Sequence, residues 1–66
     1  MSGNGLFEQA LIEAYENENA PAAADLSSQA SEAYAAEGDR ASAAFAQAFS
    51  ELMSDDGNVE ASTATE

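Results

Sequence analysis

The sequence contains no cysteine, no histidine and no lysine, and its one basic residue is Arg40. Without cysteine the chain cannot form a disulfide, and without cysteine and histidine the usual zinc ligand sets are missing. Because histidine, cysteine and lysine are absent, the chain also lacks the commonest general base, the most reactive side-chain nucleophile and the amine that forms Schiff bases, respectively. We therefore expect no enzyme activity, no metal and no cofactor.

Two groups of carboxylates remain as candidates for chemistry. Glu13 and Glu16 stand at i, i+3 spacing, where they could share a cation or a proton, although a solvated acidic helix face is the simpler interpretation. The run DDGN at 55–58 suggests a calcium loop, but aligning Gly57 with the glycine of an EF-hand puts Leu52 at the first ligand position and no glutamate at the last. We interpret this run as a polar helix end.

The carboxylates outnumber the basic residues so strongly that the formal net charge is -12. Because phosphate binding depends on Lys and Arg, nucleic acid and anionic membrane surfaces should be repelled. No apolar run is long enough for a signal peptide or a membrane span, and we expect a protein that is not secreted and works in the cytoplasm or in a virion. The expected partner is a protein, either a second copy or a larger assembly, rather than a small-molecule substrate.

Large apolar side chains are also scarce. Leu, Ile, Val and Phe together number nine, a level that with this charge is typical of disordered chains. Alanine, the best helix former, is present in seventeen copies and opposes that interpretation. A chain of 66 residues allows one domain at most, with a small core and a narrow stability margin.

The spacing of the apolar residues favours helices over disorder. They recur at helical intervals from Leu6 to Tyr15 and again, most strongly, from Ala41 to Met53. The sequence predicts an all-α fold, either a small three-helix bundle or a helical hairpin plus an extra helix. The predicted parts are a flexible N-terminus at 1–4, helices at about 5–18, 21–37 and 40–53 within one domain at 5–54, and a disordered, polar and acidic tail at 55–66.

Residues that favour helix ends support these boundaries. Asn4 is the predicted N-cap of the first helix, and Pro21 suits the first turn of the second. Gly38 suits a left-handed helix end, after which Asp39 is the predicted N-cap of the third helix.

The aromatic side chains should supply most of the buried area. Ile12 lies off the main apolar stripe of its helix, and it either wedges against a neighbouring helix, which we favour, or sits on an oligomer surface. The predicted core consists of Leu6, Phe7, Leu11, Tyr15, Leu26, Tyr34, Phe45, Phe49, Leu52 and Met53.

One stretch has a local resemblance to a repeat family. Ala33-Tyr34 followed by Gly38-Asp39 is similar to the turn that joins the two helices of a tetratricopeptide repeat. The alanine and aromatic pattern of the next helix arrives early, and no second copy of the unit is present, whereas such units stack in arrays. The resemblance therefore implies a helix-turn-helix geometry here and no membership of the family.

The overall composition resembles that of proteins from extreme halophiles and their viruses, which are rich in carboxylates and alanine and poor in lysine. In molar salt the Debye length shrinks to ~3 Å, so neighbouring carboxylates repel one another very little. Salting-out conditions also strengthen apolar burial, and a small core can then suffice. The resemblance implies a high-salt setting, with an ordinary acidic interaction protein from a high-GC organism as the alternative.

Arg40 stands in the first turn of the third predicted helix, where the helix dipole disfavours a cation. A carboxylate partner would explain its presence: Glu37 across the turn, or Glu13 or Glu16 if the first and third helices pack antiparallel. We favour an exposed ion pair of this kind over a bidentate contact to another subunit.

Two functional hypotheses follow. We favour a non-enzymatic structural or adaptor protein that packs its helices into a larger assembly. The alternative is an acidic regulatory binder of a basic protein site, with a DNA mimic as its extreme form. Molar salt separates the two, because apolar assembly persists there while charge-led binding weakens. The residues expected to contact a partner are Phe45, Phe49, Leu52, Met53, Ile12 and Arg40.

Overall fold

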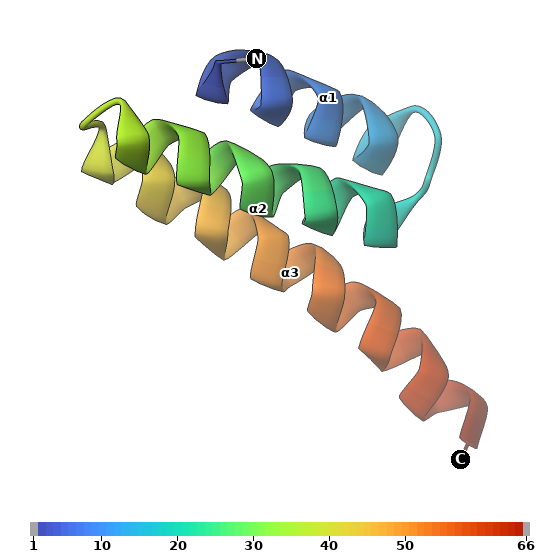
Figure 1. Cartoon of the computed structure of the whole chain (residues 1–66). Helices are drawn as coiled ribbons and strands as arrows, with labels where there is room; N and C mark the ends of the chain where they lie inside the picture. Colours follow the sequence, from blue (N-terminus) through green and yellow to red (C-terminus); the bar gives the residue numbers. More distant parts are fainter. Residues whose placement is uncertain (1, 66) are drawn as a thin grey trace.

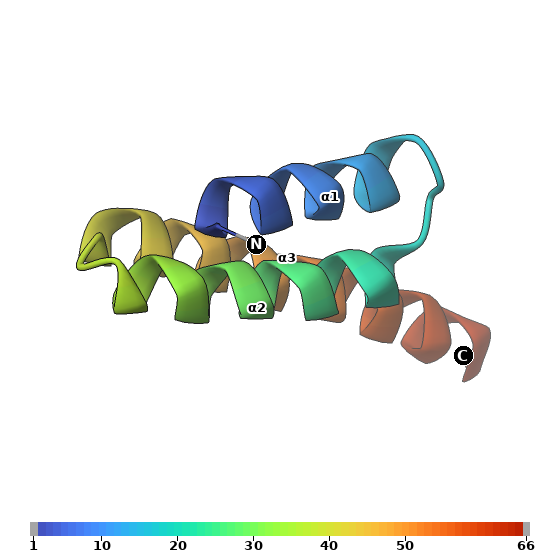
Figure 2. The same ribbon diagram turned by 45° about the horizontal axis from the view of Figure 1, so that its top comes forward.

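The computed structural model describes the backbone of residues 2–65 and the side chains of residues 2–55. Three helices follow one another, α1 (Gly3–Tyr15), α2 (Ala20–Ala36) and α3 (Arg40–Thr65), and no strand occurs in residues 2–65. α2 runs antiparallel to both of its neighbours and packs against each of them (Figure 1). The turned view shows the same arrangement, with α2 alongside α3 and α1 packed on α2 (Figure 2). The predicted all-α, three-helix fold is confirmed.

α1 begins and ends earlier than predicted. Its N-cap is Ser2 rather than Asn4, because Ser2 Oγ accepts a hydrogen bond from the Gly5 N–H at 3.3 Å. Residues 3 and 4, predicted as part of a flexible N-terminus, therefore belong to the helix. At the other end Glu18 has a left-handed backbone, with φ of 50°, so the helix stops before residue 18.

The first turn of α1 is docked on the last turn of α2. The Gly3 N–H donates to Glu37 Oε2 at 3.0 Å, and the Tyr34 hydroxyl donates to Asn4 Oδ1 at 2.6 Å. Gly3 is buried against the Tyr34 ring, and a Cβ on residue 3 would lie 2.6 Å from Tyr34 Cδ1. The close approach of these two helices thus requires glycine at this position.

The predicted residues form the ends of α2. Pro21 lies in its first turn. Gly38 has a left-handed backbone, with φ of 83°, and its N–H donates to the Ala35 carbonyl at 3.1 Å. The Asp39 N–H donates to the Tyr34 carbonyl at 2.9 Å, which completes a Schellman motif. The helix-turn-helix geometry expected for this stretch is therefore present.

α3 begins as predicted but extends further. Asp39 is its N-cap, since Asp39 Oδ1 accepts a hydrogen bond from the Ser42 N–H at 3.1 Å. The helix then continues past residue 53, because the run at 55–58 contains weak helix formers but no proline, and an established helix propagates through such residues. The predicted disorder of 55–66 falls almost entirely on residues whose side chains lie outside the described part of the chain, and it stays a prediction.

The core is built mainly from small side chains. The buried residues are Gly3, Ala10, Ala23, Ala24, Ser27, Ala30, Tyr34, Ala46 and Ser50. Of the ten residues predicted for the core, Tyr34 is buried, while Leu6, Phe7, Leu11, Leu26, Phe49 and Met53 are half-buried. The prediction is wrong for Tyr15, Phe45 and Leu52, which are exposed. Alanine and serine fill the interior because they let the helix axes approach closely, which leaves little room for larger side chains.

Three serine hydroxyls connect α2 and α3, and we call Ser27, Ser31 and Ser50 the serine seam. Ser27 Oγ donates to the Ala46 carbonyl at 2.6 Å, and Ser31 Oγ donates to the Ala43 carbonyl at 2.8 Å. Ser50 Oγ donates in the opposite direction, from α3 to the Ala24 carbonyl of α2, at 2.7 Å. Each hydroxyl that enters the interface is therefore satisfied by the backbone of the facing helix.

Candidate functional site

A group of large apolar side chains lies where α1 approaches α3, and we call it the aromatic face. Its members are Phe7, Tyr15, Phe45, Phe49 and Leu52. Tyr15 is 71% exposed, Phe45 is 66% exposed and Leu52 is 59% exposed. Phe7 and Phe49 are half-buried. A chain with few large apolar residues thus keeps several of them in contact with water.

The rings of the aromatic face contact one another across the two helices. The Phe7 ring lies 5.7 Å from Phe45 and 5.4 Å from Phe49 between centroids, and both pairs have edge-to-face geometry. Tyr15 and Phe49 are 6.5 Å apart in a tilted arrangement. Such pairs stabilise by about 0.5–1.5 kcal/mol each beyond the area they bury. The face is therefore an ordered cluster rather than a set of separate exposed side chains.

The sequence spacing of α3 explains why these residues face outward. Residues 43, 46 and 50 follow one another at three- and four-residue intervals, so they share one side of the helix, and they contact α2. Phe45, Phe49 and Leu52 follow the same intervals on a neighbouring side. α1 reaches this side mainly through its rings and does not cover it, because α1 packs chiefly on α2.

The residues predicted to contact a partner do not all lie on one surface of the molecule. Phe45, Phe49 and Leu52 lie together on the aromatic face. Met53 lies on another side of α3, in a groove next to α2, and Ile12 is half-buried on α1. The prediction did not include Phe7 or Tyr15 as partner-contacting residues. A signal for Tyr15 was its place at the last position of the first apolar stripe, directly before the polar stretch 16–19.

Arg40 is exposed at the start of α3, and the geometry around it differs from the predicted one. Glu37 accepts a hydrogen bond from the first turn of α1, and Glu13 accepts one from Asn17 at 3.2 Å. α1 and α3 run in the same direction, because each is antiparallel to α2, so Glu13 and Glu16 lie at the end of α1 away from Arg40 (Figure 1). The antiparallel packing of the first and third helices, on which a pairing of Arg40 with Glu13 or Glu16 depended, is therefore not the arrangement in this structure.

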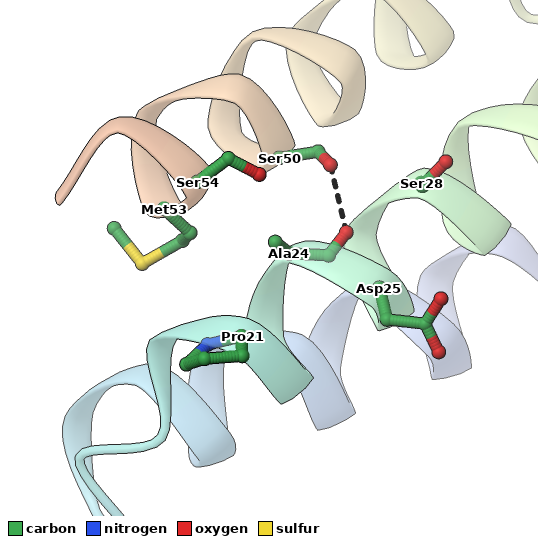
Figure 3. Close-up of a pocket in the computed structure, with 7 residues that line it drawn as sticks. All are labelled: Pro21, Ala24, Asp25, Ser28, Ser50, Met53 and Ser54. Atoms are coloured by element: carbon green, nitrogen blue, oxygen red, sulfur yellow. Dashed lines mark hydrogen bonds between the residues drawn. The ribbon is translucent and has the colours of Figure 1, made fainter. Parts of the chain in front are cut away.

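An open groove of about 660 Å³ lies between the start of α2 and the middle of α3 (Figure 3). Its lining residues are Pro21, Ala24, Asp25, Ser28, Ser50, Met53 and Ser54. Asp25 is the one ionisable side chain among them, and its carboxylate accepts a hydrogen bond from Gln29 at 3.1 Å. The Ser50 hydroxyl is used in the bond to the Ala24 carbonyl, as the dashed line in Figure 3 shows. Apart from Asp25, the groove is lined by serine side chains and by the apolar side chains of Pro21, Ala24 and Met53.

The carboxylates of the described residues remain spread out. No three of them come close enough to hold a metal ion within the range that the structure describes. The run at 55–58, considered as a calcium loop, lies in α3, and the side chains after Asp55 lie outside the described residues. Over the described range, none of the helices has both the length and the hydropathy to cross a bilayer.

The chain matches no known family model, no curated protein and no solved structure.

Proposed function

We propose that this chain is a non-enzymatic helical protein that acts as a structural or adaptor component, by packing its aromatic face against another protein. The supporting observation is the exposure of Tyr15, Phe45 and Leu52 around the ring contacts that Phe7 and Phe49 make between α1 and α3. Contiguous apolar surface on a small soluble domain marks a contact site, and aromatic side chains are enriched at the centres of protein interfaces.

The proposed setting is a high-salt environment, such as the cytoplasm or a virion of an extreme halophile. The support is compositional: the net charge is -12 and lysine is absent. In molar salt the repulsion between exposed carboxylates is screened within ~3 Å, while apolar contacts strengthen. An assembly held by the aromatic face would therefore be stable under these conditions.

Sedimentation velocity and binding of an apolar fluorescent dye in molar KCl test this proposal. The wild-type chain is compared with a Phe45→Ser, Leu52→Ser double variant and with Gln47→Ser, which alters an exposed residue on another side of α3. We expect the wild type to bind the dye or to self-associate, the double variant to lose most of either signal, and the control to match the wild type. Circular dichroism verifies that all three are helical. A folded wild-type monomer that neither binds dye nor self-associates would contradict the proposal.

A further inference from the structure

We propose that two copies of this chain exchange α1, so that the first helix of each chain docks on α2 of the other. In this domain-swapped dimer α1 would make the contacts that it makes within one chain, and residues 16–19, which join α1 to α2, would act as the hinge. The inference goes beyond the proposed function, because it does not use the exposed side chains of the aromatic face. It is carried by backbone strain in the hinge and by the way α1 is held.

The hinge contains a residue in an unfavourable backbone conformation. Glu18 has φ of 50°, and in this left-handed region the Cβ of an L-residue crowds the next carbonyl oxygen, which disfavours it by about 5- to 30-fold. The turn between α2 and α3 avoids this cost, because its left-handed residue is Gly38. Short connections under strain favour domain swapping. The strain therefore points to the first connection as the hinge and to α1 as the exchanged element.

α1 is also held by few buried groups. Two of its 13 residues are buried, Gly3 and Ala10, whereas five residues of α2 are buried. The hydrogen bonds from Gly3 to Glu37 and from Tyr34 to Asn4 both lie in the first turn of α1, at the end away from the hinge. Elements with few buried contacts open at the lowest free energy. A released helix of this length is marginal in water, so α1 must dock again, either on its own α2 or on that of a second copy.

The hinge can open without disturbing α2. Asn19 Oδ1 accepts a hydrogen bond from the Ala22 N–H at 3.3 Å, and Pro21 lies in the first turn of α2. Inside a longer helix this proline would clash with the preceding turn, so residues 16–19 would open to an extended chain rather than join α1 and α2 into one helix. Four extended residues span about 13 Å, which lets α1 reach past its own α2 to a chain related by a two-fold axis near the hinge.

Chain concentration and salt decide between the closed monomer and the swapped dimer. A short connection keeps α1 at a millimolar effective concentration near its own α2, so a second copy competes when the chain itself is near millimolar. The strain is relieved at both hinges of the dimer, which shifts this balance toward exchange. A net charge of -12 on each chain opposes association in dilute salt, and molar salt screens that repulsion. We therefore expect the swapped dimer at millimolar chain in molar KCl.

The test uses the contact between Gly3 and the Tyr34 ring as a reporter. Equal amounts of isotope-labelled and unlabelled full chain are refolded together from urea at millimolar concentration in molar KCl. Isotope-filtered NMR then detects nuclear Overhauser effects between differently labelled chains only. Because the Tyr34 ring lies against residue 3, such an effect between these two residues shows that α1 has docked on another chain. Sedimentation equilibrium in the same buffer gives the dimer dissociation constant.

Substitutions in the hinge test its role in the exchange. Glu18→Gly should weaken the dimer at least tenfold, because glycine adopts the left-handed conformation freely and no strain is left to relieve. Glu18→Pro should strengthen it at least tenfold, because proline holds φ at about −65° and excludes the closed turn. Glu16→Gly is the matched control: it removes a carboxylate and adds a glycine in the same connection, but Glu16 has φ of -94°. We expect this control to change the dissociation constant by less than about threefold.

Leu52→Ser separates this inference from the proposed function, because it removes an exposed side chain of the aromatic face and leaves the hinge unchanged. The swapped dimer should persist in this variant. A dimer that is lost with Leu52→Ser and shows no effect between Gly3 and Tyr34 of different chains would overturn the exchange and leave the proposed function standing. A swapped dimer that binds no dye and does not associate through the aromatic face would overturn the proposed function alone.

Two further results would overturn the exchange of α1. One is a wild-type chain that is folded and monomeric at millimolar concentration in molar KCl. The other is an equal dissociation constant for the wild type and Glu18→Gly. If Glu18→Pro fails to fold, the comparison of Glu18→Gly with Glu16→Gly still decides, since glycine is compatible with the closed turn at residue 18.

Discussion

At the scale of single residues, the contact between Gly3 and Tyr34 joins the beginning of the chain to the end of α2. The Tyr34 ring covers the backbone of residue 3, and its hydroxyl is hydrogen-bonded to Asn4. Tyr34 is also the largest side chain in the buried cluster with Ala30 and Ala46. One tyrosine thus holds the start of α1 on α2 and is the largest member of this buried cluster.

Gly3→Ala should destabilise the chain by about 1–3 kcal/mol, the range for overpacking a closed contact. The physical reason is that the new Cβ would stand 2.6 Å from Tyr34 Cδ1, so the ring or α1 must move. Urea unfolding in molar KCl, followed by circular dichroism, measures the change in the free energy of unfolding.

The control for this prediction is the same substitution in a Tyr34→Leu background. Since leucine removes the ring that the Cβ would meet, Gly3→Ala should cost much less there, and the two substitutions should couple. If Gly3→Ala costs the same in both backgrounds, the contact between residue 3 and the ring does not constrain α1.

At the scale of the helices, the serine seam decides how closely α2 and α3 approach. Ser27→Ala should lower the free energy of unfolding by about 0.5–1.5 kcal/mol, because it removes the hydrogen bond from Ser27 Oγ to the Ala46 carbonyl, which lies within α3. Ser27→Val should cost more, since Ser27 is completely buried and the facing helix leaves no space for a branched side chain. Denaturant unfolding of both variants measures the difference.

The neighbouring serine provides a matched control for the seam. Ser28 lines the open groove and is half-buried. Ser28→Ala and Ser28→Val should therefore leave the free energy of unfolding within about 0.5 kcal/mol of the wild type, the usual range for surface substitutions. Equal effects at residues 27 and 28 would contradict the assigned packing of α2 on α3.

The cap of α3 should make stability depend on pH. Hydrogen bonds from the Ser42 side chain and from the Ser42 N–H lower the pKa of Asp39 below 3.8. A carboxyl group whose pKa is lower in the folded chain than in the unfolded chain stabilises the fold when the pH is above the unfolded pKa. This contribution to stability is lost as the pH falls from 3.8 through the folded pKa. The stability difference between the wild type and Asp39→Asn should therefore shrink in that acidic range.

Thermal unfolding of both chains across that range, in molar KCl, measures the effect. Ser42→Ala removes the hydroxyl that contributes most to the lowered pKa of Asp39, and it should reduce the pH dependence while leaving the carboxylate in place. An Asp39→Asn profile parallel to the wild type through the acidic range would show that the cap does not titrate with the fold.

At the scale of the whole molecule, the helicity of the chain should rise cooperatively when KCl is increased from dilute to molar concentration. A net charge of -12 on 66 residues opposes compaction, and screening removes that opposition. Far-UV circular dichroism at fixed protein concentration follows the transition. Sucrose serves as the control, because it strengthens burial without screening charge. An unchanged spectrum from dilute to molar KCl would show that the carboxylates do not limit folding.

Local chemistry made the three helices and the turn between α2 and α3 predictable. Pro21, Gly38 and Asp39 each have a conformational preference that depends on their nearest neighbours, and all three occupy the predicted positions. The start of α1 was predictable only in part. Serine and asparagine both favour the N-cap position, and the start at Ser2 rather than Asn4 goes with the docking of Gly3 against Tyr34 and Glu37, which are far away in the sequence.

The aromatic face was only partly predictable. Apolar size suggested that Phe45 and Leu52 belong to the core, but the close packing of α2 and α3 depends on Ala46 and on serines that look like surface residues. Which side of an amphipathic helix is buried depends on the helix that covers it, and α1 does not cover all of α3. The side of α3 that packs on α2 was indicated in the sequence by the three- and four-residue intervals between residues 43, 46 and 50, which carry small side chains rather than large ones.

The order of the helices also sets how fast the chain can fold. α2 packs against the helices directly before and after it in the sequence, and the connections between them are short (Figure 1). Closing such small loops costs little entropy, and helical domains dominated by near-neighbour contacts fold in microseconds to milliseconds. Once salt permits folding, refolding should therefore be complete before manual mixing ends, and the rate of assembly should be set by the encounter with the partner.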